Sequence, residues 1–228
     1  MKTFSRGSLL LMALACLMSG GVTAATADVT EGKDYVRSKA SARLAPGDKI
    51  EVLEFFSYGG THSQELEPYL SAWLDKLPAD VEFRRVPVLF ATRWLELAKV
   101  CYTLEALGVQ RRLSREVFVA IDKENLPLFR EQPFLDWAER KGLDRTRVAE
   151  IYNSPQIAAK INEAKALVQA YDVQVAPTVI VDSKFATNYE RAGTPERFPV
   201  VLDALMAKAR AERRQAAPPV NAESSPTR

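Results

Sequence analysis

The residues that could carry out chemistry gather at one junction, where an aromatic and β-branched run meets a segment with helical spacing. Gly59 and Gly60 end the run, and Thr61, His62 and Ser63 follow them directly. A hydroxyl group and an imidazole are the parts of a nucleophile and its base. Adjacent residues at the start of a helix do not give the geometry of a hydrolase triad, so we do not expect that chemistry here.

His62 is the only histidine in the chain. Zinc sites generally use three or four ligands from His, Cys, Asp and Glu, so a single histidine argues against a metal centre. We expect no metal and no cofactor. Three interpretations of His62 stay open: an exposed residue at a helix start, a polar contact to a bound peptide, or a catalytic group.

The cysteines do not form a pair in the exported chain. Cys16 lies in an apolar leader, which leaves Cys101 alone. Apolar residues recur at helical spacing around Cys101, and this pattern predicts a buried, inert thiol. An odd cysteine also leaves open an intermolecular disulfide or a reactive thiol.

The first 27 residues have the pattern of a secretory signal peptide. A basic start precedes an apolar run of about 10 residues, and small residues end the segment. We predict export with cleavage near Ala27; a retained membrane anchor and acylation at Cys16 are the alternatives. Loss of Lys2 and Arg6 reduces the 31 basic residues to 29, which equals the 29 acidic residues. This balance does not favour nucleic acid or anionic lipid as a partner, and no later segment is apolar enough to span a bilayer.

The hydrophobic pattern places these residues on alternating strands and helices. A strand over residues 49–56 leads into a helix from Ser63, and a second strand over residues 81–88 follows; a crossover helix implies that the two are parallel. Further helices are predicted at residues 94–107, 113–121, 133–141 and 144–152 and from residue 155, with strands at 178–182 and 185–189 and a last helix to about residue 213.

This order predicts an α/β fold in which a helical insertion interrupts a sheet domain. The sheet domain comprises residues 28–90 and 154–214, and the insertion comprises residues 91–153. The Pro- and Ser-rich residues 215–228 are predicted to form a disordered tail.

Two segments resemble the DsbA-type thiol:disulfide oxidoreductases. Residues 52–63 are similar to the active-site segment of that family, and residues 175–178, Val-Ala-Pro-Thr, are similar to its cis-proline loop. The resemblance covers residues 49–210. It implies a thioredoxin fold with an inserted helical domain, and a location in the periplasm.

The chain departs from the family at the residues that perform its chemistry. Family members carry Cys-Pro-His-Cys at the helix start, where this chain has Gly60, Thr61, His62 and Ser63. Disulfide exchange proceeds by attack of a thiolate on sulfur through a mixed disulfide, and neither Gly60 nor Ser63 supplies sulfur. The resemblance therefore implies a redox-inactive member.

Glu54 corresponds to the acidic residue that the family has beneath its active site. Without cysteines this carboxyl has no proton to transfer, so we expect a relic that is paired with a lysine or with water. If the side chain is buried, its pKa should be raised.

Peptide binding does not require sulfur and could persist. By resemblance, Pro177 would follow a cis peptide bond and expose the backbone of Ala176, to which an extended peptide can add as a β-strand. His62 would contact the same peptide.

The helix start itself allows two interpretations. Thr61 and Gln64 have the spacing of a capping box, which predicts a conventional cap. Alternatively, free N–H groups beside Gly59 and Gly60 bind a carboxylate or a peptide carbonyl.

These observations favour an exported protein that binds unfolded or extended polypeptides in a chaperone-like role. One alternative is a thiol:disulfide oxidoreductase that acts through Cys101 or through cysteines of a partner. Another is a non-redox enzyme on the same scaffold. Kappa-type glutathione transferases, which have a similar fold, use a serine at the position that Gly60 holds here.

Overall fold

β2 (Ile50–Phe56) is the strand that leads into the residues of interest. The computed structural model describes residues 28–39 and 48–216. β2 pairs in parallel with β3 (Val81–Pro87) and antiparallel with β4 (Thr178–Val181), so the predicted parallel pair is confirmed. All residues of β2 except Glu51 are buried, because helices cover both faces of the sheet.

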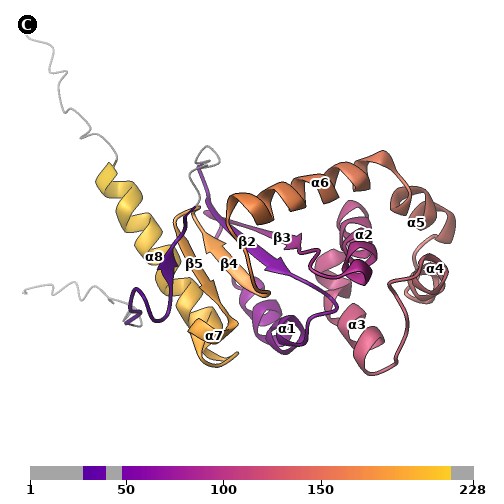
Figure 1. Cartoon of the computed structure of the whole chain (residues 1–228), viewed down its shortest axis with the longest axis horizontal. Coiled ribbons are helices and arrows are strands. Elements are labelled where there is room, and N and C mark those ends of the chain that lie inside the picture. The colour runs from indigo at the N-terminus through magenta and orange to yellow at the C-terminus, as the bar shows by residue number, and fades with distance from the viewer. Residues whose placement is uncertain (1–27, 40–47, 217–228) are drawn as a thin grey trace, which may run out of the picture.

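The sheet has five strands in the order β1-β5-β4-β2-β3 (Figure 1). β5 (Phe185–Asn188) forms a hairpin with β4, and β1 (Val36–Arg37) pairs antiparallel with β5 at one edge. The sequence did not predict β1, since two residues are too few to show the alternation that marks a strand.

Helices pack on both faces of the sheet (Figure 1). α1 (Thr61–Leu74) and α8 (Arg197–Ala216) share a core with Val52, whereas α6 (Pro155–Ala170) shares a core with Leu53 and Phe55. Successive residues of β2 therefore point to opposite faces. α7 (Tyr189–Ala192) is a single helical turn between β5 and α8.

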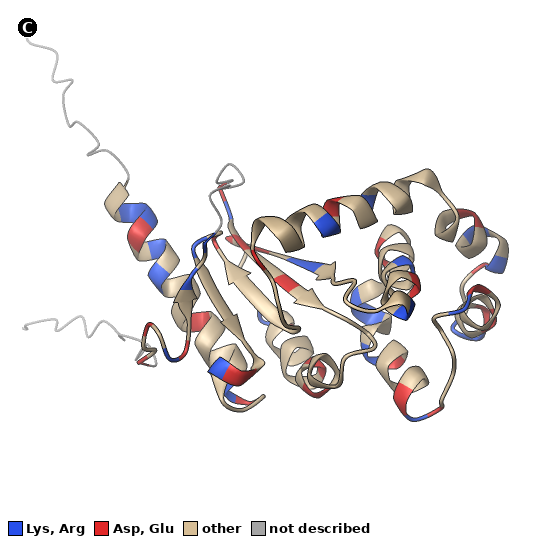
Figure 2. Cartoon of the chain, viewed as in Figure 1, with Lys and Arg blue, Asp and Glu red and all other residues tan. Residues whose placement is uncertain are grey.

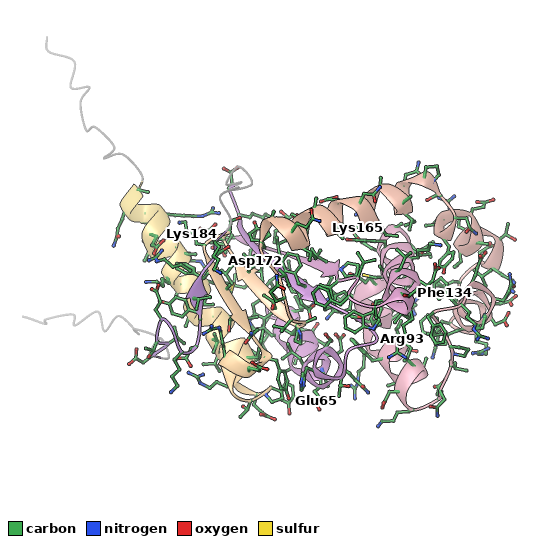
Figure 3. The ribbon with its side chains drawn as sticks, in the orientation of Figure 1. Glu65, Arg93, Phe134, Lys165, Asp172 and Lys184 are labelled. Atoms are coloured by element: carbon green, nitrogen blue, oxygen red, sulfur yellow. The ribbon has the colours of Figure 1, made fainter. Side chains whose placement is uncertain are left out.

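Four helices lie between β3 and α6 in the chain: α2 (Thr92–Ala106), α3 (Gln110–Asp122), α4 (Glu131–Arg140) and α5 (Arg145–Tyr152). They surround a separate apolar core that contains Trp137 and Phe134, the latter labelled in Figure 3. Phe56 and Tyr58, at the end of β2, belong to the same core. The start of α1 therefore lies where these four helices meet the sheet.

Several helix boundaries have the residues that commonly begin or end helices. Asp144 accepts a hydrogen bond from the N–H of Arg147 at 2.7 Å, as expected of a cap. Gly108 and Gly142 have positive φ after α2 and α4, a conformation that glycine adopts readily. α8 continues to Ala216, so the predicted start of the tail at residue 215 is two residues too early.

The predicted signal peptide with its cleavage site, and the part of the predicted tail beyond residue 216, lie outside the described residues. Across residues 28–39 and 48–216, no helix combines the length and the apolar character that a membrane span requires. Lys and Arg are interspersed with Asp and Glu along the helices (Figure 2). On α8, for example, Arg210 pairs with Asp80 and Arg213 pairs with Asp182.

Candidate functional site

α1 begins one residue after a glycine that has no side chain to cap it. Gly60 is the N-cap residue, with φ −101° and ψ 123°, and no side chain in the described part of the chain caps the helix. The predicted capping box of Thr61 and Gln64 is therefore wrong: Thr61 is already the first helical residue. The N–H of Gln64 donates to Gly60 O at 3.1 Å. The first N–H groups of α1 are thus left without a side-chain acceptor.

Ser63 stabilises the turn that precedes the helix. Its Oγ accepts a hydrogen bond from the N–H of Ser57 at 3.3 Å, while Ser57 Oγ accepts from the N–H of Gly59 at 3.1 Å. The N–H of Gly60 also donates to Ser57 O at 3.0 Å. Because Ser63 is buried and its hydroxyl is directed into this turn, it is not presented to a substrate as a nucleophile.

The two glycines of the turn differ in the space around them. A Cβ atom on Gly59 would lie 2.7 Å from Trp94 Nε1, a distance that no side chain tolerates without movement. A Cβ atom on Gly60 would lie 3.4 Å from Ser63 Oγ and 3.8 Å from Ser63 Cβ, which is ordinary contact. Cβ atoms of a disulfide lie about 3.5–4.5 Å apart. Positions 60 and 63 therefore have the spacing of a disulfide without its sulfur atoms.

His62 belongs to a small cluster on the surface. Its side chain is exposed, its ring stacks on Tyr189 with centroids 4.3 Å apart, and its Nδ1 lies 3.2 Å from Glu65 Oε2. The Tyr189 hydroxyl donates to the same Glu65 oxygen at 2.7 Å. Hydrogen bonds from Tyr189 and His62 lower the pKa of Glu65, and its carboxylate in turn raises the pKa of Tyr189 to about 12. Glu65 lies at the outer side of α1 (Figure 3).

Tyr189 also links this cluster to the proline loop. The Ala176–Pro177 peptide bond is cis, as predicted. The N–H of Tyr189 donates to Pro177 O at 3.4 Å, so His62 and Pro177 both contact one residue. The ring of Pro177 is buried, whereas Ala176 is partly exposed. Among the described residues, neither the N–H nor the C=O of Ala176 has a hydrogen-bond partner.

Apolar side chains border the helix start. Phe90 and Val175 are two of the four large apolar side chains that are exposed in the described ranges, at 46% and 47%. Phe90 lies beside Trp94, with ring centroids 6.0 Å apart, and Trp94 lies against Gly59. Trp94 and Ala176 pack on the same buried core, the one that α6 covers. Phe90 and Val175 are thus apolar side chains that are available for contact with another molecule.

Glu54 is buried beneath the helix start, and its partner differs from the expectation. Arg85 Nε donates to Glu54 Oε2 at 2.7 Å, so the carboxyl is paired with an arginine rather than with a lysine or water. The two residues are direct neighbours in the register of β2 and β3. Burial raises the pKa of Glu54, as predicted, and the guanidinium of Arg85 opposes that rise.

Arg85 has further side-chain partners that the sequence analysis did not identify. It pairs with Glu67 of α1 and donates to the hydroxyl of Ser114 on α3. Tyr58 donates to Ser114 as well, at 3.3 Å. Glu67 carried a signal, since it lies on the apolar side of α1 between buried leucines, where a charged residue is rare unless it is paired. This network connects the sheet, α1 and the helical segment beneath the site.

Cys101 is buried within the core of the helical segment, as predicted. Gln110 Nε2 lies 2.9 Å from its sulfur, and burial raises the pKa of the thiol. The thiolate, which is the reactive form, is therefore disfavoured. No group of three or more His, Cys, Asp or Glu side chains suited to a metal ion occurs within the described residues.

Comparison with known proteins gives consistent matches over most of the chain. Residues 52–195 match the DSBA-like thioredoxin domain. The thiol:disulfide interchange protein DsbA of Pseudomonas aeruginosa is 37% identical over 201 residues, which are 88% of this chain and 94% of that protein. The protein of the same name from Azotobacter vinelandii is 34% identical, over 81% of this chain and 86% of its own length. The crystal structure of Pseudomonas aeruginosa DsbA superposes with a TM-score of 0.76 at 36% identity, over 82% of this chain and 97% of that one.

Proposed function

The chain belongs to the family of DSBA-like thioredoxin domains, and on this premise we propose that it is an exported, periplasmic member that binds extended polypeptides without exchanging disulfides. One observation carries the proposal. The spacing of positions 60 and 63 suits a disulfide, yet these positions hold a hydrogen atom and a hydroxyl group. The positions at which the family has its cysteines therefore have the spacing of a disulfide in this chain but carry no sulfur atoms.

The loss of sulfur removes both halves of the interchange reaction. A thiolate must attack a sulfur atom, and a second thiol must resolve the mixed disulfide. The buried hydroxyl of Ser63 can do neither, and it is already engaged with Ser57. Cys101 does not replace the pair, because its thiol is enclosed in the helical core and its pKa is raised.

The features that a bound polypeptide would use do not depend on sulfur. The unpaired N–H and C=O of Ala176 can form hydrogen bonds to an extended chain, in the manner of an added β-strand. Val175 and Phe90 offer exposed apolar surface nearby. The stacked rings of His62 and Tyr189 offer a flat, partly polar surface beside the loop. We infer that the partners are unfolded or extended polypeptides that have been exported with this protein.

The test uses the chain without residues 1–27. Binding of fluorescent, unstructured peptides is measured by anisotropy, suppression of aggregation is measured with a denatured protein, and oxidation of a model dithiol is measured in parallel. We expect binding at micromolar concentration, suppression of aggregation, and no turnover of the dithiol. Pro177→Thr should weaken binding because it alters the loop that presents Ala176.

Two outcomes would count against the proposal. Absence of peptide binding at micromolar concentration would remove the binding role. Turnover of the dithiol that Cys101→Ser abolishes would instead support an oxidoreductase acting through that thiol.

A further inference from the structure

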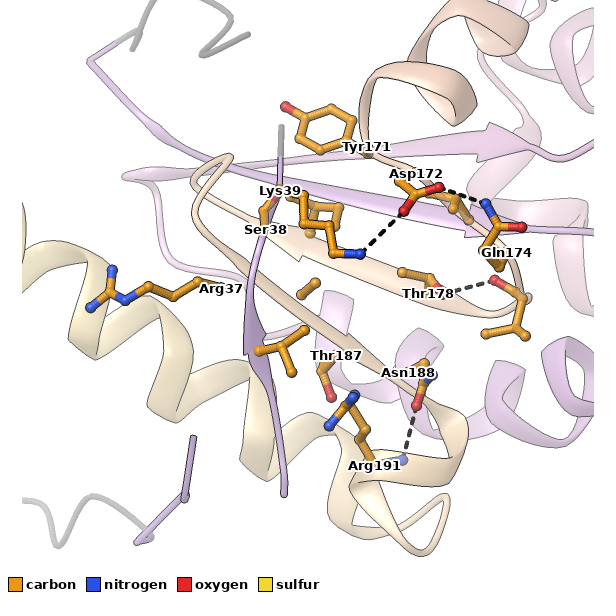
Figure 4. A pocket seen from close by; sticks show the side chains of 15 residues that line it. Arg37, Ser38, Lys39, Tyr171, Asp172, Gln174, Thr178, Thr187, Asn188 and Arg191 are labelled. Carbon is orange, nitrogen blue, oxygen red and sulfur yellow. Dashed lines mark hydrogen bonds and ion pairs between the residues drawn. The ribbon is translucent and has the colours of Figure 1, made fainter. Parts of the chain in front are cut away.

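A pocket of about 360 Å³ opens over the β1-β5-β4 part of the sheet (Figure 4). Its apolar lining includes Val36, Ile180 and Ala186, one from each of these strands. The core under α6 takes its buried strand residues from β2, β3 and β4. α6 therefore covers one side of this face and leaves the side toward β1 without a helix.

The charges around the pocket are mainly positive. Arg37, Lys39 and Arg191 line it, and Asp172 is the one acidic residue in the lining. Lys39 Nζ lies 3.6 Å from a carboxylate oxygen of Asp172 (Figure 4). Arg37 Nη2 lies 3.2 Å from Oε1 of Glu212, a residue that does not line the pocket.

Arg191 differs from the other two cations in its partners. Its Nη1 donates to the backbone carbonyls of Gly32 and Lys33, at 2.9 and 3.3 Å. Backbone carbonyls orient the guanidinium but do not neutralise it, and no carboxylate among the described residues pairs with it. A carboxylate in the pocket would meet a positioned, uncompensated charge.

The pocket is continuous with the candidate peptide site. Val175 and Asn188 line it, and the residues that follow them, Ala176 and Tyr189, belong to that site. An extended chain advances about 3.3 Å per residue. A polypeptide bonded to the backbone of Ala176 that continues past Val175 would lie over the pocket within about two to four residues.

We propose that this pocket receives a further part of the polypeptide held at Ala176, and that this part carries an apolar side chain followed within about three residues by Asp or Glu. The apolar side chain packs on Val36, Ile180 and Ala186, and the carboxylate pairs with Arg191. This inference rests on the proposed function and adds a sequence preference to it.

The test compares two matched peptides that bind the mature chain. One contains an apolar residue followed by Asp and Glu, and its twin contains Asn and Gln at the two acidic positions. An exposed ion pair contributes up to about 1 kcal/mol, which corresponds to about fivefold in affinity, so we expect the acidic peptide to bind about threefold to fivefold more tightly. This preference should decrease as salt is added.

Substitutions of pocket residues test whether the preference for the acidic peptide arises in the pocket. Arg191→Gln should bring the two affinities within about twofold of each other. Lys39→Gln, at a side chain that is 84% exposed, provides a second change that does not threaten folding, and it should reduce the preference in the same direction. Arg140→Gln, an equal change of charge at an exposed position on α4, should leave the preference intact.

The outcomes separate the two proposals. If neither peptide binds, the proposed function falls and this inference falls with it. If both peptides bind equally well, or if Arg191→Gln leaves the preference unchanged, only the inference is overturned. A concentration-dependent dimer that Arg191→Gln dissociates would assign the pocket to a second copy of the chain and would also overturn it.

Discussion

Gly60 and Ser63 face one another across the first turn of α1 so that a Cβ atom on Gly60 would lie 3.8 Å from the Cβ atom of Ser63. This is a typical separation for the Cβ atoms of a disulfide. The nearest other atom, Ser57 O, lies at 3.4 Å, so a side chain at position 60 meets no steric barrier. The turn has room for two cysteine side chains, although it holds a glycine and a serine.

The double change Gly60→Cys with Ser63→Cys should therefore form a disulfide without movement of the backbone. The first thiol would lie at the start of a 14-residue helix, where unpaired N–H groups and the helix dipole favour a thiolate. We expect the double variant to oxidise a model dithiol. Free-thiol titration after oxidation and the rate of dithiol oxidation measure this.

A single variant provides the control for that experiment. Gly60→Cys alone can form a mixed disulfide but cannot resolve it, so it should not turn over. A double variant that forms its disulfide yet remains inactive would show that more than the two cysteines separates this chain from its relatives.

The neighbouring glycine should respond in the opposite way to a small substitution. Gly59→Ala places a Cβ atom 2.7 Å from Trp94 Nε1, and overpacking of this kind costs about 1–3 kcal/mol of the free energy of unfolding. Gly60→Ala meets only ordinary contacts and has negative φ, so its effect should stay within about 1 kcal/mol. Urea unfolding at equilibrium compares the two. Equal losses would contradict the packing of Trp94 on Gly59.

The burial of the Glu54 carboxyl leads to a prediction about how the free energy of unfolding depends on pH. Burial raises the pKa of Glu54 in the folded state above the ordinary value of 4.5. At a pH between 4.5 and this raised pKa, the folded state keeps a proton on Glu54 that the unfolded state has lost. The free energy of unfolding should then decrease as pH rises from about 4.5 through the folded pKa. Glu51, whose pKa burial also raises, contributes a decrease of the same sign.

Glu54→Gln should remove its share of that decrease. Urea unfolding between pH 4 and pH 8 gives the slope for both proteins, and Glu124→Gln, at an exposed position between α3 and α4, serves as the control with an unchanged slope. If the slope of Glu54→Gln matches that of the native chain, the carboxyl does not titrate differently in the folded and unfolded states.

The partner of Glu54 shows where sequence reasoning reached its limit. Two arginines, Arg84 and Arg85, occupy adjacent positions of β3, and the strand turns them to opposite faces of the sheet. Arg84 reaches Glu163 on α6, whereas Arg85 reaches Glu54. Only the register between β2 and β3 decides which one lies beneath the site, and a strand pattern read alone does not contain that register.

The sequence predicted the order of the long elements, because their patterns are local, but it placed the start of α1 at Ser63, two residues after the observed start at Thr61. It did not predict the contact of His62 with Tyr189, which joins residues from α1 and α7 that are far apart in the chain. The predicted cap failed for a local reason. Thr61 has the right side chain but lies one residue inside the helix, and boundaries are the least certain part of a helical pattern.

Cys101 should be inert toward thiol reagents in the folded chain. Its side chain is buried and its thiol has a raised pKa, so reaction requires local or global unfolding. We expect the rate of modification by a disulfide reagent to increase at least about 100-fold in denaturant. A fast reaction under native conditions would revive the interpretation in which this thiol takes part in exchange.

Val175 offers the most direct test of the surface beside the cis-proline loop. It is 47% exposed and precedes Ala176, whose backbone groups have no partner in the described part of the chain. Val175→Ser removes apolar surface that a bound polypeptide would cover, and the loss of two methyl groups should weaken peptide binding about threefold to tenfold. Val200→Ser, at a valine on α8 that is 43% exposed, removes the same groups elsewhere and should leave affinity unchanged. Anisotropy titrations of one peptide against both variants measure the difference, and an equal loss in the two would mean that binding follows general surface hydrophobicity rather than this loop.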